Sequence, residues 1–142
     1  MGDLVEWLRA QLDEDERIAR AASEYTEAEW RLDEDGETVL WWPPEPRVAD
    51  KEREKGLPVV SDRWRGQTIY ARAAPHVAAH DPARVLREID AKRRILAEHW
   101  LNGWVCDTCD NGEVGQTFPC ATLRLLALPY ADRPGYREEW RP

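Results

Sequence analysis

The sequence predicts a mostly helical α+β fold, and three observations lead to this prediction. Apolar residues recur at helical spacing in two long segments, one at the start of the chain and one in its second half. Between them lies a short stretch of strand-forming residues around an Asp-Gly turn. Near the C-terminus, three cysteines and a histidine have the spacing of a zinc site. We expect one domain over residues 1–142, because two separate domains would each bury little apolar surface.

The first expected element is a long helix over residues 4–22. Asp3 is suited to cap it, because its carboxylate can accept hydrogen bonds from the free N–H groups of the first turn. Apolar residues at helical spacing would form one buried stripe. They are Leu4, Val5, Leu8, Leu12, Ala19 and Ala22.

One small β-hairpin is expected over residues 30–42. Its strands flank residues 33–36, which end in the Asp-Gly pair that is typical of tight turns. Prolines follow directly and end regular structure. We expect the charged residues 47–66 to form a mobile loop, with one short strand at residues 59–60.

A short helix and two main helices are expected in the second half. The short helix covers residues 69–79 and must hold Pro75 in its first turn or bend there, because proline lacks a backbone N–H. The first main helix begins after Asp81-Pro82, which supplies a capping carboxylate and a proline at the first helical position, and it ends at about residue 99 or 100. Its expected buried face consists of Val85, Leu86, Ile89, Leu96 and Trp100.

The second main helix is expected over about residues 119–128. Its leucines lie on nearly all sides, so we expect it to be the most deeply buried element. They are Leu123, Leu125, Leu126 and Leu128. Two aromatic anchors in the tail, between residues 130 and 140, predict that the tail packs back on the body.

The cysteines predict a structural zinc site. Cys106 and Cys109 form a CxxC pair on a turn, which allows two thiolates to reach one ion at about 2.3 Å. Cys120 begins the last helix, where the positive end of the helix dipole favours a thiolate. Tetrahedral zinc takes a fourth ligand, and we expect His99 at the end of the long helix. Such a site would join the long helix, the loop and the last helix.

Other interpretations of these residues remain open. A redox CxxC pair requires a strand–turn–helix setting that the sequence does not predict here. Unligated core thiols and a catalytic zinc with an open position are further alternatives, although the H-x-E box of zinc deaminases is absent from the sequence. His76 or His80, four residues apart, could replace His99 as the fourth ligand.

Composition limits the partners and the compartment. The formal net charge is -8, from 28 acidic and 20 basic side chains, whereas binding to phosphate groups needs an excess of Lys and Arg. Nucleic acid is therefore not the expected partner. No apolar run approaches the roughly 20 residues of a membrane span, and the first residues lack the order of a signal peptide. An odd number of cysteines is more typical of the reducing cytoplasm than of a disulfide framework.

These observations predict a small cytoplasmic binding or adaptor protein, stabilised by zinc, whose partner is a protein. The sequence offers no complete set of catalytic residues in a recognisable motif. Trp41 and Trp42, at the end of the hairpin, are candidate contact residues, because aromatic side chains often anchor interfaces. A zinc-dependent hydrolase and a nucleic-acid-binding zinc module are the alternatives.

Several motifs carry a family resemblance. They occupy residues 12–16, 80–86, 91–96, 120–132 and 136–140. These motifs resemble an uncharacterised family of actinobacterial and actinophage proteins, known as domain of unknown function 6221, whereas residues 25–68 match it weakly. The resemblance implies no activity. Arg133 and Gly135 stand where histidine and aspartate are common in the family, so any role of that histidine does not carry over.

Overall fold

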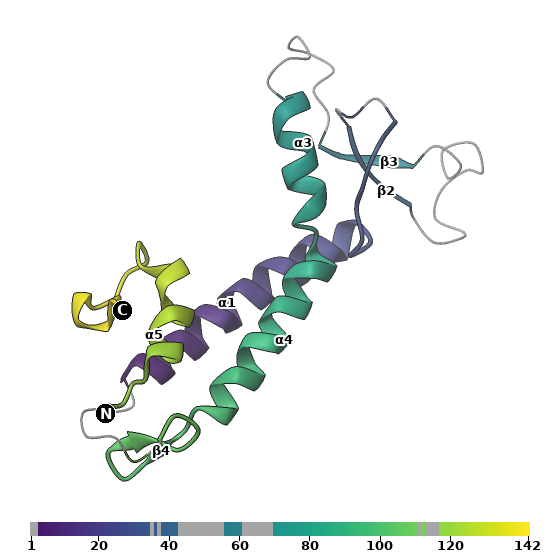
Figure 1. Ribbon diagram of the computed structural model, residues 1–142. Coiled ribbons are helices and arrows are strands. Elements are labelled where there is room, and N and C mark those ends of the chain that lie inside the picture. Colours follow the sequence, from purple (N-terminus) through teal and green to yellow (C-terminus); the bar gives the residue numbers. More distant parts are fainter. Residues whose placement is uncertain are drawn as a thin grey trace. The chain divides into compact units, whose positions relative to one another are not determined.

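The computed structural model describes residues 3–34, 36, 38–42, 56–60, 70–110, 112 and 117–142. Within these residues the fold is mostly helical α+β (Figure 1). The chain divides into two compact units, Met1–Asp15 with Glu88–Pro142 and Glu16–Arg87. Whether they form one domain stays a prediction. None of the helices in the described part combines the length and apolar character needed to cross a bilayer.

The N-terminal helix, α1, covers Asp3–Tyr25 and so extends slightly beyond the predicted residues 4–22. Leu4, Leu8 and Leu12 recur every four residues and are almost fully buried, as is Ala19 further along. Two members of the predicted stripe, Val5 and Ala22, are only half-buried. The helical periodicity of the sequence is therefore confirmed.

A three-stranded antiparallel sheet contains the predicted hairpin. Strand β1 (Arg31–Leu32) pairs with β2 (Val39–Trp41), and β2 pairs with β3 (Leu57–Val60). In the turn, Gly36 adopts a φ of 72° and its N–H donates to the carbonyl of Asp33 at 2.9 Å. The predicted strand at residues 59–60 is thus found and begins two residues earlier. Residues 47–55 and 61–66 of the expected mobile loop lie outside the described residues.

Two helices follow the sheet. Helix α3 (Tyr70–Ala79) holds Pro75 as its sixth residue, so the proline lies beyond the first turn. Helix α4 covers Pro82–Glu98. The carboxylate of Asp81 accepts a hydrogen bond from the N–H of Arg84 at 2.7 Å, which confirms the predicted N-cap. Ile89 and Leu96 are buried, as the periodicity of this helix predicts.

The expected burial of Trp100 and of the last helix is wrong. Helix α4 ends at Glu98, so Trp100 no longer follows its buried face and is 51% exposed. Helix α5 covers only Ala121–Ala127. A helix this short buries one side, so Leu123 is fully buried while Leu125 is 57% exposed.

A second hairpin, which the sequence analysis did not predict, follows α4. Strand β4 (Leu101–Asn102) pairs antiparallel with β5 (Val105–Cys106). Gly103 and Trp104 form the turn between these strands, and Gly103 adopts a φ of 64°.

The tail packs on the N-terminal part of α1, as predicted. It contains two 3₁₀ turns, η1 (Leu128–Tyr130) and η2 (Glu138–Trp140). The ring of Trp7 lies 5.4 Å from that of Trp140 and 5.7 Å from that of Tyr136, centroid to centroid. Such contacts are typical of packed aromatic clusters. Tyr130 and Trp140 are the buried aromatic anchors of this tail.

Candidate metal centre

The end of α4 places His99 at the entrance to the second hairpin. Its N–H still donates to the carbonyl of Ile95 at 3.1 Å, so the backbone hydrogen bonding of the helix reaches this residue. The chain then enters β4, where Leu101 pairs with Cys106 of β5. The hairpin therefore returns the first cysteine to the end of the helix that carries the histidine.

A tight turn holds the CxxC pair. The N–H groups of Cys109 and Asp110 both donate to the carbonyl of Cys106, at 3.2 and 2.9 Å. The N–H of Asp107 donates to the carbonyl of Trp100 at 3.0 Å. The hydroxyl of Thr108 donates to the carbonyl of Glu98. These bonds attach the turn to the end of α4, so the thiols of the CxxC pair face the histidine.

Cys120 reaches the cluster from the start of α5. It is the N-cap residue of this helix, and its carbonyl accepts a hydrogen bond from the N–H of Arg124 at 3.1 Å. The N–H of Phe118 donates to the carbonyl of Trp104 at 3.4 Å, which links this segment to the hairpin. A cysteine distant in sequence from the CxxC pair is thereby brought beside it.

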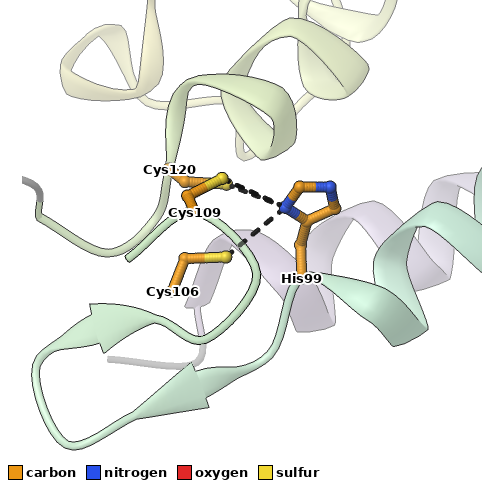
Figure 2. A group of neighbouring side chains, drawn as sticks. All are labelled: His99, Cys106, Cys109 and Cys120. Carbon is orange, nitrogen blue, oxygen red and sulfur yellow. Dashed lines mark hydrogen bonds between the residues drawn. The ribbon is translucent and has the colours of Figure 1, made fainter. Parts of the chain in front are cut away.

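Three sulfur atoms surround one imidazole nitrogen. Figure 2 shows the thiols of the three cysteines pointing at the same ring atom of His99. The distances from Nδ1 to Sγ are 3.4 Å for Cys106, 3.4 Å for Cys109 and 3.5 Å for Cys120. The four potential ligand atoms all lie within 4.8 Å of one another. Among the described residues, this is the one group of His, Cys, Asp and Glu side chains that converges in this way.

Hydrogen bonding alone does not account for this arrangement. A neutral imidazole nitrogen either carries one hydrogen or offers one lone pair, so it cannot bond to three thiols at once. A tetrahedral zinc ion with bonds of about 2.3 Å to sulfur and about 2.0 Å to nitrogen separates those atoms by about 3.5 Å. The nitrogen–sulfur distances, 3.4 to 3.5 Å, are close to that value. The cluster is therefore compatible with a metal ion such as zinc.

The electrostatics of the cluster also favour a cation. Cys106 and Cys120 are buried, and His99 and Cys109 are half-buried. Burial, followed by hydrogen bonds with the thiols of Cys120 and Cys106, raises the pKa of Cys109 from 9.0 to about 11. Several thiolates in one place repel one another unless a positive charge lies between them. A divalent cation at the centre would remove that repulsion.

The other predicted site residues lie elsewhere in the fold. His76 and His80 contact each other, with ring centroids 4.2 Å apart, so His99 is the histidine that lies with the cysteines. Trp41 ends β2 and is half-buried, whereas Trp42 is 37% exposed and borders a cleft of about 420 Å³. A binding role for Trp41 and Trp42 stays a prediction.

One exposed residue of this region was not singled out in the sequence analysis. Trp104, in the turn of the second hairpin, is 77% exposed. The signal that could have found it is Gly103, because glycine is typical of the first position of a two-residue type II′ hairpin turn. A hairpin with Gly103 and Trp104 as its turn residues places Trp104 at its tip.

The geometry gives one cluster of potential metal ligands within the described residues. The model of a family of unknown function, DUF6221, matches residues 1–142. The chain therefore belongs to this family over its whole length, as the motifs in its two ends predict. Neither a curated protein nor a solved structure matches the chain.

Proposed function

We propose that this protein is a small, zinc-stabilised binding protein without catalytic activity. The observation that carries the proposal is the convergence of three thiols and Nδ1 of His99 on one point. In this proposal Cys106, Cys109, Cys120 and His99 hold one zinc ion. The ion fixes the end of α4, the β4–β5 hairpin and the start of α5 relative to one another within their unit. Its role is to stabilise the fold.

The number of converging ligands argues against the alternative of a zinc-dependent hydrolase. A catalytic zinc needs a coordination position for water or substrate, and usually has three protein ligands. Here four side chains would complete a tetrahedron. The proposed ion therefore has no open position from which to activate water.

Charge argues against the alternative of a nucleic-acid-binding zinc module. The net charge of the chain is -8. Residues 98–110, which include three of the four proposed ligands, contain three carboxylates and no Lys or Arg. Phosphate groups would be repelled by such a segment. A protein is the better partner, and a reducing compartment such as the cytoplasm would keep the thiols able to bind metal.

Metal analysis of the purified protein tests the zinc site. We expect about one zinc ion per chain, because one tetrahedral set is present. Cys106→Ser, Cys109→Ser, Cys120→Ser and His99→Ala should each lose the metal and destabilise the fold. His76→Ala is the matched control, since this exposed histidine lies outside the cluster and its loss should leave the zinc content unchanged.

X-ray absorption at the zinc edge separates a structural site from a catalytic one. The proposal expects three sulfur neighbours at about 2.3 Å and one nitrogen at about 2.0 Å. An additional exchangeable oxygen neighbour would contradict a structural role and favour the hydrolase. The proposal as a whole would be overturned if the protein is purified without metal and is folded equally well in the presence and absence of a chelator.

A further inference from the structure

The β4–β5 hairpin exposes two tryptophans directly beside the proposed zinc site. Trp104 is 77% exposed and Trp100 is 51% exposed. Tryptophan is large and mostly apolar, so a folded protein usually buries much of it. Two well-exposed indoles within five residues are therefore a feature that packing among the described residues does not explain. In Figure 1 the hairpin is the short element labelled β4 that follows α4.

The backbone beneath these side chains is held in place. The carbonyl of Trp104 accepts the hydrogen bond from the N–H of Phe118, and the carbonyl of Trp100 accepts one from the N–H of Asp107. The side-chain amide of Asn102 donates to the carboxylate of Asp107 at 2.9 Å. Of the proposed zinc ligands, His99 precedes the hairpin by two residues and Cys106 is its last residue. Rigid backbone reduces the entropy lost when exposed aromatic side chains bind a partner.

The segment that carries the two tryptophans has charges of one sign. Glu98, Asp107 and Asp110 are exposed, and residues 98–110 contain no Lys or Arg. Three thiolates around a divalent zinc ion would add a further net negative charge. The face of an indole ring attracts cations, and nearby carboxylates strengthen that attraction. Together these groups have the chemistry of a site for guanidinium or ammonium groups.

We propose that Trp100 and Trp104 form a docking surface for an arginine- or lysine-rich segment of a partner protein. This inference rests on the proposed function, because the zinc site is what holds the hairpin. An acidic second copy of this chain and a nucleic acid both carry the wrong charge for such a surface. A basic segment satisfies the exposed rings and the carboxylates at once.

The test uses defined probes and the full-length protein. A fluorescein-labelled peptide with alternating arginine and glycine is titrated with the protein, and binding is followed by fluorescence anisotropy. Two control probes are used: the same peptide with glutamate in place of arginine, and a labelled oligothymidylate. We expect binding of the arginine probe alone, weakened by salt. Trp104→Ala should weaken it about tenfold, and Trp104→Phe less, because phenylalanine keeps an aromatic face.

The controls separate this inference from the proposed function. Leu125→Ala removes an exposed apolar side chain of the same unit and should leave the affinity for the arginine probe unchanged. Zinc content is measured on every sample. Zinc-free wild-type protein would show that the proposed function fails. Three results with zinc-loaded protein would overturn the docking surface alone. The wild-type protein could fail to bind the arginine probe at about 1 mM, or the Trp104→Ala variant could bind that probe as tightly as the wild type. The wild-type protein could also prefer the glutamate probe or the oligothymidylate.

Discussion

The unit that carries the cysteines and the unit that carries the three-stranded sheet are stabilised by different kinds of contact. In Met1–Asp15 with Glu88–Pro142, side chains distant in sequence meet through specific chemistry, as in the approach of three thiols to His99. In Glu16–Arg87, β1, β2 and β3 are joined by backbone pairing, and α3 packs against β1 and β2. The backbone hydrogen bonds of the sheet involve no metal ligand, so loss of one ligand side chain should affect the first unit far more than the second.

Removal of the metal should show this difference most strongly. Structural zinc contributes roughly 10 kcal/mol or more to the folding of small zinc domains. In Cys120→Ser, or after treatment with a chelator, we expect rapid hydrogen exchange of the backbone amides over residues 99–110 and 117–127. The paired amides of β1 and β2 should keep their protection. Equal loss of protection in both units would contradict the distinction between them.

The pH dependence of metal binding follows from the protonation of the cluster. Since the pKa of Cys109 is raised to about 11, this thiol is protonated at neutral pH until a metal displaces the proton. Zinc binding should therefore release protons, and its affinity should fall as the pH falls, by about tenfold per pH unit for each proton displaced. Zinc titrations in weakly buffered solution with a pH indicator measure the release. A zinc affinity that does not change between neutral and acidic pH would rule out thiolate ligation.

Loss of one tail aromatic tests the side-chain contacts away from the metal. Trp140 is buried and contacts both Trp7 and Tyr136. Trp140→Ala should reduce the free energy of unfolding by about 3–5 kcal/mol. Trp104→Ala, which removes an exposed tryptophan from the same unit, should change it by less than about 0.5 kcal/mol. Urea unfolding of both variants measures the difference, and similar losses would mean that exposure does not distinguish these tryptophans.

Alanine substitution of two glycines compares the cost of an added Cβ in a crowded turn of one unit with its cost in an open turn of the other unit. Gly135 adopts a φ of 86°, and an added Cβ would lie 2.9 Å from Nε1 of Trp7. Gly36 has a similar φ of 72° but nothing within 4 Å of that position. Gly36→Ala should cost about 1 kcal/mol of unfolding free energy from the backbone alone. Gly135→Ala should cost about 2 kcal/mol, because the indole must also move. Equal costs would show that Trp7 yields freely.

The sequence predicted the parts of the fold that rest on local chemistry. Asp81-Pro82 marked the start of α4 because a carboxylate and a proline each suit one defined helix position. The leucines of α1 marked its buried face through their spacing. The four residues of the cluster were selected because few combinations of cysteine and histidine spacing suit one ion, and the structure brings all four together.

The features that the sequence did not predict depend on tertiary structure. Strands β4 and β5 have two residues each, too few to show an alternating pattern. The exposure of Leu125 depends on which sides of α5 other elements cover, and periodicity alone does not contain that information. The same reason accounts for Trp100, whose burial would have required α4 to continue past Glu98.

The smallest expected effect is on the coupling free energy of ion pairs, and one ion pair from each unit is compared. The guanidinium of Arg133 lies 2.5 Å from the carboxylate of Asp15, with side chains 32% and 20% exposed. It also stacks over the ring of Tyr130, at 4.7 Å from the ring centroid. In the other unit, Arg20 lies 2.6 Å from Glu16, but the arginine side chain is 66% exposed. Water and salt screen the Arg20 pair more strongly than the Arg133 pair.

A double-mutant cycle for each pair should therefore give about 1 kcal/mol of coupling for Asp15 with Arg133 and about 0.3 kcal/mol for Glu16 with Arg20. Added salt should remove the second coupling and leave much of the first. The cycle subtracts the contacts that each residue makes with other groups, including the stacking on Tyr130, so it reports the charge pair alone. Equal couplings for the two pairs would contradict the expectation, because the nitrogen–oxygen distances are nearly the same and the Arg133 side chain is the more buried of the two arginines. A larger coupling between Asp15 and Arg133 would mean that the burial of Arg133, more than its distance to the carboxylate, determines how strongly this ion pair holds the tail on α1.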